Sequence, residues 1–450
     1  IKNFWYVITA DPTSIFGRKY KLKPHRYQGV DTELYEAKLP PLLRYFHIKE
    51  INPSGWIEIP NDKILETTSK TYCKYECTID FKEIVPLPQK ETPIPAIVAS
   101  WDIEASSSHG DFPVAIKSYR KLIGEIITYW TIHNKEIRLL GKDRQTRLVI
   151  KLIKAAFGFD NAEDISKVFP KKKVLEENLN GKITHLMTEP LNSVIERFRI
   201  MEARENRRKL YRNKDDDDDE EIHNISQSWG NYVRKKATFL DYLNDKKCDA
   251  GKKLEIIDEA AKIILPPLEG DKVTFIGTTF MRVGECEPYL NYMAVLGDCD
   301  EVEIENSETI IECYETERDL LMGWTEMIRE QHPDILIGYN TFGFDWKFMS
   351  ERAQELNCMR PETLDDKHEE EIWFSELSRN KGEYCKKIEK EIRIASGTHQ
   401  MIYMDMPGVI QIDLYNYFRR EVNLGSYKLN DVASHFIGDM VKDWEKLDDT

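Results

Sequence analysis

The chain has 450 residues, of which 41% are apolar and 11% are aromatic, so it is long enough to bury more than one hydrophobic core. Its formal net charge of −15 argues against a general nucleic-acid coat protein, although a local basic cleft remains compatible with a bound phosphate chain. The sequence has no apolar run of membrane-spanning length and no signal-like segment, and its eight cysteines follow no disulfide framework. These features predict an intracellular protein with reduced thiols and no membrane partner.

The first part of the chain predicts a small β-rich domain over residues 1–95. Short aromatic and β-branched runs such as GWIEIP and YECTIDF alternate there with turn residues. The stretch VPLPQKETPIPA then carries four prolines, which predicts a stiff linker. We expect a second domain over residues 96–450, opened by the apolar strand IVASWDIEAS at residues 97–106.

A long charged insertion follows this strand, over about residues 114–269. Its periodicity is helical: in RQTRLVIKLIKAAF, Leu148, Leu152 and Ala155 share one side, which predicts a packed surface helix with a solvated charged face. The stretch near residues 213–224, with its run of aspartates, is too charged to bury and is predicted to be disordered. Carboxylates on such a segment are not preorganised to hold a metal.

Strands and helices alternate after the insertion. DKVTFIGTTFMR and NYMAVLG are strand-like, and a helix opened by Thr316 with Asp319 three residues on follows them. The strand DILIGYN leads into a helix starting near Phe344, and the strand GVIQIDL leads into the helical YNYFRR. This alternation predicts an α/β domain with a mixed sheet.

Three acidic places stand out, the first at the end of strand 97–106. Because side chains alternate along a strand, Asp102 and Glu104 share one face while Trp101 and Ile103 point to the other. Two carboxylates on one face repel each other unless a cation sits between them. The alternative is a strand end at which both charges are simply hydrated.

The second place is GYNTFGFDWKF, where Asp345 falls in the first turn of the helix. Taken alone, Asp345 is typical of a helix cap or dipole partner. Asn340 and Phe344 add a polar group and a ring, and their structural alternatives are an N-cap and a helix staple.

The third place is GSYKLNDVASHF. Leu429, Val432, Ala433 and Phe436 have helical spacing and predict a buried stripe. Tyr427 and Asp431 lie four residues apart on the opposite face, where the alternative is two ordinary surface residues.

Together these motifs are much more specific than they are singly. Asp-x-Glu on a strand, then Asn-x-x-x-Phe-Asp, then Tyr-x-x-x-Asp on a helix resembles the three exonuclease motifs of family B DNA polymerases. LYEAKLPPLLRYFHIKEINPSGWIEIP, DFPVA, HPDILIGYN and GSYKLNDVASHFIGD are similar to the delta-like members, which include polymerases of large DNA viruses. The charged insertion departs from that pattern.

The resemblance implies a ribonuclease-H-like exonuclease domain that cuts DNA from its 3′ end with two divalent metals, Mg²⁺ or Mn²⁺. It assigns the metals to Asp102, Glu104, Asp345 and Asp431. By similarity, Asp102 bridges both ions, Glu104 and Asp431 complete the site that activates the nucleophile, and Asp345 faces the second ion. The same similarity gives Tyr427 the orientation of the attacking water, and gives Asn340 and Phe344 contacts to the DNA strand.

The palm motifs of family B polymerases, Asp-x-x-Ser-Leu-Tyr-Pro-Ser and Tyr-Gly-Asp-Thr-Asp, do not occur in the sequence. We therefore expect the N-terminal portion of a replicative polymerase, acting in a nucleus or at a viral replication site, with the C-terminal polymerase domain and replication accessory proteins as partners. Two rival hypotheses remain. One is a catalytically silent module that binds single-stranded DNA, and the other is a free-standing exonuclease acting on RNA.

Overall fold

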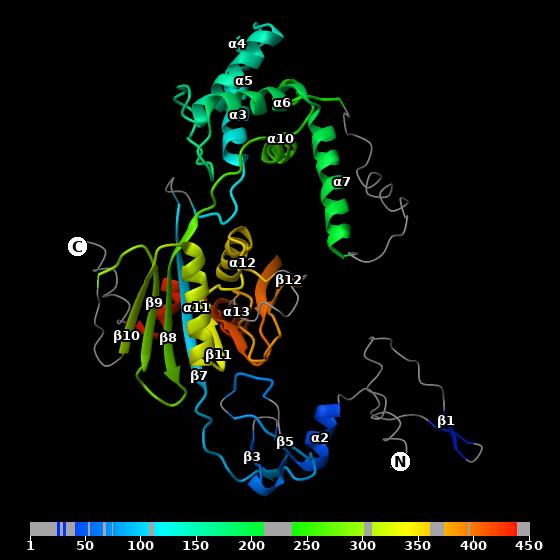
Figure 1. Cartoon of the computed structure of the whole chain (residues 1–450), viewed down its shortest axis with the longest axis vertical. Helices are drawn as coiled ribbons and strands as arrows, with labels where there is room; N and C mark the ends of the chain where they lie inside the picture. The colour runs from blue at the N-terminus through cyan, green and yellow to red at the C-terminus, as the bar shows by residue number, and fades with distance from the viewer. Residues whose placement is uncertain are drawn as a thin grey trace. The chain divides into compact units, whose positions relative to one another are not determined.

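The computed structural model describes residues 25–27, 30–32, 41–52, 55–65, 69–73, 75–107, 112–210, 236–300, 308–360, 373–394 and 397–438. The chain divides into two compact units, Ile1–Ala96 and Ile97–Thr450, whose elements are labelled in Figure 1. The stretch 213–224, predicted to be disordered, lies outside the described residues. All eight cysteines carry free thiols.

The first unit consists of short elements. Its described part holds one helix, one 3₁₀ turn and three antiparallel strand pairs: α2 (Pro41–Lys49), η1 (Asn61–Lys63), β1 (His25–Tyr27) with β2 (Val30–Thr32), β3 (Trp56–Glu58) with β6 (Val85–Leu87), and β4 (Ile64–Leu65) with β5 (Thr78–Ile79). The linker prediction is wrong for β6, because Pro86 lies opposite Ile57 in a strand pair. In a two-stranded sheet each strand is an edge, where proline's missing N–H is tolerated.

A six-stranded mixed sheet forms the centre of the second unit, which confirms the predicted mixed α/β class. Its strands are β7 (Ile97–Ser106), β8 (Lys272–Arg282), β9 (Leu290–Leu296), β10 (Glu308–Tyr314), β11 (Ile335–Gly338) and β14 (Ile410–Asp413). Their order is β10-β9-β8-β7-β11-β14. β8 runs antiparallel to both β7 and β9, while β11 pairs in parallel with β7 and with β14.

Two helices bury the apolar face of β7. The predicted helix is α11 (Glu317–Gln331), whose Thr316 side chain caps the Asp319 N–H, and α12 (Asp345–Glu355) is the second. α11 lies in front of the sheet and runs alongside β7 in Figure 1. The Trp101 ring lies 5.4 Å from the Trp324 ring of α11 and 4.7 Å from the Trp346 ring of α12. This aromatic cluster fixes the two helices against the strand that carries Asp102.

The insertion is helical and has a core of its own. Its described helices are α3 (Arg120–Ile132), α4 (Asn134–Ile137), α5 (Lys142–Ala156), α6 (Glu176–Thr188), α7 (Leu191–Leu210), α9 (Phe239–Asn244) and α10 (Ala250–Ile264). The predicted amphipathic helix is α5, with Leu152 buried and Lys151 exposed. The two ends of the insertion pair, because the Asp271 N–H donates to the Val114 carbonyl and the Val114 N–H donates to the Asp271 carboxylate, both at 2.9 Å. A long insertion between neighbouring strands is compatible with the sheet when its ends meet in this way.

The last elements are a hairpin and two helices: β12 (Lys386–Ile394), β13 (Gly397–Asp405), α13 (Leu414–Glu421) and α14 (Leu429–Phe436). The buried stripe predicted for α14 is wrong, since only Val432 is buried while Leu429 and Phe436 are about half exposed, at 52% and 51%. The Phe436 ring stacks on Phe418 of α13 at 4.9 Å. These two short helices cover each other only in part, and α14 does not enter the sheet core.

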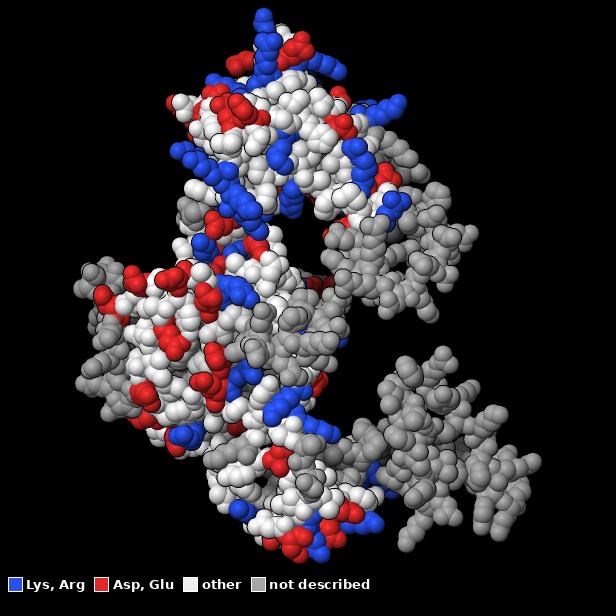
Figure 2. Space-filling view, in the orientation of Figure 1, with Lys and Arg blue, Asp and Glu red and all other residues white. Residues whose placement is uncertain are grey.

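Charge is unevenly distributed over the visible surface. In the view of Figure 2, acidic side chains are frequent over the part that holds β8, β9 and α11, whereas Lys and Arg are frequent over the helical insertion. The net charge of −15 therefore does not describe every surface of the chain.

Candidate active site

The site begins where β7 outruns its parallel neighbour. β11 pairs with β7 only from Val98 to Ser100, so no strand among the described residues pairs with β7 on that side beyond Ser100. Gly338, the last residue of β11, lies against β7: a Cβ there would sit 2.7 Å from the Trp101 carbonyl oxygen, closer than real Cβ atoms approach backbone. This close contact brings the loop after β11 to the level of Asp102.

Asp345 lies on the side of β7 where the pairing with β11 has ended. It is the first residue of α12 and is only 3% exposed. Its carboxyl shares a hydrogen bond with Asp102, and the Ile103 N–H lies within reach of both carboxyls. Burial, followed by the neighbouring Asp102 charge, raises the pKa of Asp345 to about 7. Asp102 is exposed as a residue, but partial burial of its carboxyl raises its pKa, against the opposing effect of its hydrogen bonds.

Glu104 lies two residues further along β7. Glu104 is exposed, as Asp102 is. Ile103, which lies between them, and Trp101, which precedes Asp102, are buried, as the alternation of side chains along a strand predicts. The register between β7 and β8 shifts between Glu104 and Ala105. Such a bulge bends the strand just beyond the two carboxylates.

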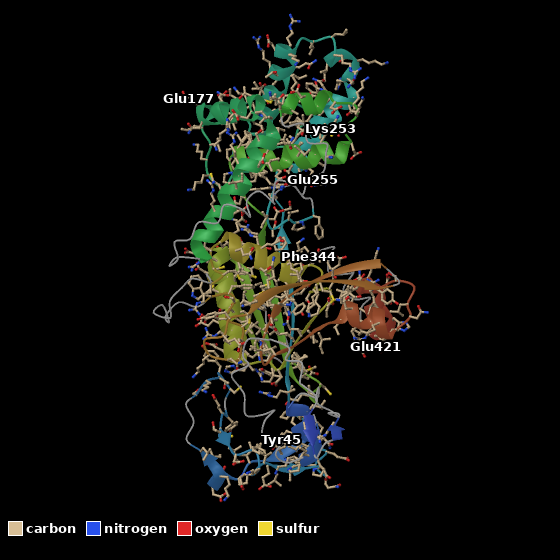
Figure 3. The ribbon with its side chains drawn as sticks, turned by 90° about the vertical axis from the view of Figure 1, so that its right-hand side faces the viewer. Tyr45, Glu177, Lys253, Glu255, Phe344 and Glu421 are labelled. Carbon is tan, nitrogen blue, oxygen red and sulfur yellow. The ribbon has the colours of Figure 1, made fainter. Side chains whose placement is uncertain are left out.

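The loop before α12 carries Asn340 and Phe344. Asn340 has a left-handed backbone with φ 61°, and its carbonyl accepts hydrogen bonds from Gly343 and Phe344. Asn340 does not cap α12, because the N-cap position is Phe344 and no side chain bonds there. The staple alternative describes part of Phe344's contacts, since its ring lies 5.4 Å from Phe348. Figure 3 labels Phe344 at the start of α12.

Phe112 is a site neighbour that sequence reasoning missed. Its ring meets Phe344 edge-on at 5.3 Å although it is 75% exposed. The Phe112 ring, packed against a second ring near two carboxylates, is therefore an apolar surface open to solvent. The only signal in the sequence was an aromatic residue eight positions after Glu104, in DFPVA.

Tyr427 and Asp431 are linked to the Asp102–Asp345 pair less directly. The Tyr427 hydroxyl donates to the Val422 carbonyl at 2.8 Å and accepts from the Leu424 N–H at 3.2 Å, so it is engaged within its own loop. Asp431 is exposed on α14. Tyr339 links this region to the second motif: its hydroxyl donates to the Tyr427 carbonyl at 2.6 Å, and the negative charge of Asp431 contributes to its raised pKa after burial and nearer groups.

Among the described residues, the structure brings Asp102 and Asp345 into direct contact, but it gathers no group of three or more His, Cys, Asp or Glu side chains that could hold an ion. The pair itself fits a divalent cation. When two carboxyls share one proton, that proton offsets their mutual repulsion, and a bound cation would offset it in the same way. Their oxygens are hard ligands suited to Mg²⁺ or Mn²⁺.

One cavity among the described residues does not contain these carboxylates. It has a volume of about 380 Å³ and is lined by Phe112, Lys117, Lys121, Lys167 and Asp271 among others. It shares Phe112 with the site. Its wall includes the Lys117–Asp271 ion pair of 2.6 Å, so it lies where the insertion joins the sheet.

A mixed α/β domain with a carboxyl pair at the end of a central strand defines the structural class. The chain matches the family described as DNA polymerase family B, exonuclease domain, over residues 32–181 and 253–432. The protein therefore belongs to the family B DNA polymerases and carries their exonuclease domain. The family normally uses divalent metals.

Its relatives are viral and eukaryotic polymerases. The chain is 34% identical to a DNA polymerase of Phaeocystis pouchetii virus over 97% of its own length and 42% of the relative's. It is 30% identical to a DNA polymerase of Pyramimonas orientalis virus, over 95% and 32% respectively. A DNA polymerase delta catalytic subunit of Candida albicans is 31% identical over 40% of this chain and 16% of the relative. The chain thus spans less than half the length of these relatives.

Proposed function

We propose that the chain is the N-terminal part of a replicative DNA polymerase and removes nucleotides from unpaired 3′ ends of DNA, in the 3′ to 5′ direction, with two divalent metals. The observation that carries this function is the hydrogen-bonded Asp102–Asp345 pair, on the part of β7 beyond its pairing with β11, in a chain of the exonuclease family. The domain is assigned as ribonuclease-H-like over residues 96–450, with the helical insertion within it, and residues 1–95 as a β-rich N-terminal domain.

The metal-binding residues in this proposal are Asp102, Glu104, Asp345 and Asp431. When bound, two divalent ions supply charge for both the attacking and the leaving oxygen of a phosphodiester. The chain's own contribution is to hold two carboxyls so close that their repulsion disfavours the metal-free, doubly ionised state. The hydrogen bond between Asp345 and Asp102 ties the ligand on α12 to the strand that carries Asp102.

The substrate-binding residues in this proposal are Asn340 and Phe344, and we add Phe112. Aromatic rings stack on unpaired bases of any sequence, which suits an enzyme that must accept every frayed 3′ end. The Phe112 ring already meets the Phe344 ring in a T-shaped contact and is mostly exposed, next to the residue that precedes Asp345. Tyr427 is assigned to orient the attacking water, which requires its hydroxyl to leave the Val422 carbonyl.

The remaining polymerase domains and replication accessory proteins are the proposed partners, and a nucleus or viral replication site is the proposed place of action. No helix among the described residues is long and apolar enough to cross a membrane.

The test is degradation of a 5′-labelled DNA with an unpaired 3′ end in Mg²⁺. We expect shortening from the 3′ end that stops when Asp102→Ala and Glu104→Ala are combined. The matched control combines Glu285→Ala and Glu287→Ala, two exposed carboxylates with the same spacing in the β8–β9 loop, and should leave the rate unchanged. An RNA of the same sequence, added as competitor, separates this function from an RNA exonuclease, because RNA should compete poorly.

One observation favours a second candidate, a silent module that binds single-stranded DNA: within the described residues no three acidic groups are gathered into an ion site. Binding of a single strand without any shortening, in a folded chain supplied with Mg²⁺, would establish that candidate and exclude the exonuclease.

A further inference from the structure

Asp413 is a buried carboxylate outside the motifs, and nothing in the sequence paired it with them. It is 3% exposed at the end of β14. One oxygen accepts from the Asn340 N–H and the Tyr415 N–H, both at 2.9 Å. The other accepts from the Phe342 N–H at 3.2 Å and from the Asn416 side chain at 2.8 Å. Four donors therefore converge on one side chain.

Sheet register explains why this carboxylate reaches the second motif. β14 runs parallel to β11, and Asp413 lies opposite Gly338, the residue after which the chain leaves β11. The loop from Tyr339 to Phe344 thus starts beside Asp413, at a level where its first N–H groups have no strand to pair with. An unpaired buried N–H is costly, so the carboxylate that accepts two of them defines the path of the loop.

The loop is tight as well as anchored. Asn340 is left-handed at φ 61°, and its side-chain oxygen would lie 2.3 Å from a Cβ at Gly343, so any other residue there would displace the Asn340 side chain. The Trp346 N–H donates back to the Thr341 carbonyl at 3.1 Å. A loop with so little slack transmits a displacement at Asn340 to Asp345, five residues on.

We propose that Asp413 is a positioning residue of the exonuclease: it holds the 339–344 loop so that Asn340 faces the DNA strand and Asp345 lies beside Asp102. The inference rests on the proposed function for the roles of Asn340 and Asp345, but not for the contacts of Asp413. Asp413 touches neither substrate nor metal and acts only through the loop. The same carboxylate caps α13, so the loop and that helix share one anchor. Figure 3 shows α13, which ends at the labelled Glu421.

Asp413→Asn is the informative variant because it keeps the size of the side chain. A carboxylate accepts on both oxygens, whereas a carboxamide accepts on one and donates on the other. Whichever way the new carboxamide is turned, two of the four donors then face an NH₂ group. The matched control is Asp258→Asn, the same substitution at a buried aspartate of α10, 4% exposed, whose charge pairs with Lys262 at 3.0 Å.

Hydrogen exchange of the whole 450-residue chain, followed by mass spectrometry, tests the anchor. We expect Asp413→Asn to speed exchange across residues 339–346 by about tenfold or more, without changing β8 and β9. Asp258→Asn should leave 339–346 unchanged. Unchanged exchange at 339–346 in Asp413→Asn, or an equal rise in every peptide, would overturn the inference.

The Mg²⁺ dependence of 3′ shortening separates positioning from mere loss of folded protein. A smaller folded fraction lowers the rate but not the Mg²⁺ concentration at half-maximal rate. A displaced Asp345 weakens the metal site, so in Asp413→Asn we expect that concentration to rise about fivefold or more. An unchanged concentration, with a rate that falls in step with the folded fraction, would reduce Asp413 to a structural residue. If the unaltered chain shortens no DNA, the proposed function fails, and exchange alone decides whether Asp413 anchors the loop.

Discussion

At the scale of single residues, the Asp102–Asp345 pair sets a pH dependence on the stability of the metal-free chain. Burial and the Asp102 charge raise the pKa of Asp345 from 3.8 to about 7 in the folded state. Between these values the folded chain holds a proton that the unfolded chain has lost. The stability of the folded chain therefore weakens as the pH rises from about 4 to about 7.

Asp345→Asn should remove this dependence, since an amide mimics the protonated acid. In EDTA we expect the variant to unfold at a higher temperature than the unaltered chain at pH 8, by about 2 °C or more, and at nearly the same temperature at pH 4. Thermal unfolding followed by circular dichroism measures both. Equal unfolding temperatures of the variant and the unaltered chain at pH 8 would show that the Asp345 charge does not destabilise the folded chain. Mg²⁺ should stabilise the unaltered chain more than the variant.

Phe112 allows a cleaner test of base stacking than Phe344, which also packs on Phe348. Because Phe112 is 75% exposed, Phe112→Ala should change stability little and weaken binding of a single strand by about 1 to 3 kcal/mol, roughly 5- to 150-fold. Fluorescence anisotropy in Ca²⁺ measures the affinity. Leu139→Ala is the control, at an 88% exposed apolar residue of the insertion. Equal affinity for both variants would remove Phe112 from the binding surface.

Motif spacing predicted which residues to bring together, and for Asp102 and Asp345 the structure supplies the contact. Asp413 shows the limit of that reasoning. An aspartate at a strand end before a helix has the same pattern whether it caps the helix, binds a metal or anchors a neighbouring loop. Only the β14–β11 register, a long-range property, distinguishes these roles.

At the scale of elements, a buried ion pair joins α11 to α12. The Arg352 Nε–H donates to Glu317 at 2.8 Å, and the two side chains are 3% and 5% exposed. Glu317 also accepts from the Val273 N–H at 2.9 Å, and Arg352 donates to the Ala115 carbonyl at 3.1 Å. The pair therefore ties both helices to β8 and to the start of the insertion.

Removing one partner should be costly, because it leaves the other charge buried alone. We expect Arg352→Met to lower the free energy of unfolding by about 3 to 5 kcal/mol, and the added change Glu317→Gln to recover part of that loss. Urea unfolding provides the measurement. Lys272→Met, which breaks a 3.1 Å pair with Glu269 in which both side chains are nearly half exposed, should cost less than about 1 kcal/mol. Similar losses in the two single variants would contradict this account.

Both α11 and the short C-terminal α14 were predictable as helices, but only α11 buries the face that its spacing predicts. α11 buries the five apolar residues of one face, since the sheet gives it a broad apolar surface: Leu320, Leu321, Trp324, Met327 and Ile328. α14 has the same spacing but faces α13, itself without buried residues, so its stripe stays half exposed. A periodic pattern identifies a face, while burial depends on what that face meets.

At the scale of the whole second unit, two separate hydrophobic cores divide the folding energy. One lies among α3–α10 and includes Ile183, and the other lies between the sheet and α11 and α12 and includes Leu321. Every broad contact between two elements joins partners within the same half. Polar contacts that join the halves are the exchange between Val114 and Asp271, the Lys117–Asp271 pair, and a Lys171–Glu355 ion pair.

Two cores joined by a few polar contacts should lose protection independently. Ile183→Ala and Leu321→Ala each delete a fully buried side chain at a cost of about 2 to 5 kcal/mol. In low urea, we expect Ile183→Ala to speed hydrogen exchange in α10 while β8 keeps its protection, and Leu321→Ala to do the reverse. If either variant exposed both halves to the same extent, the insertion and the sheet would form one cooperative unit, and the polar contacts between them would be stronger than their number implies. Independent loss would instead mean that the helical insertion can open while the strand carrying Asp102 stays folded.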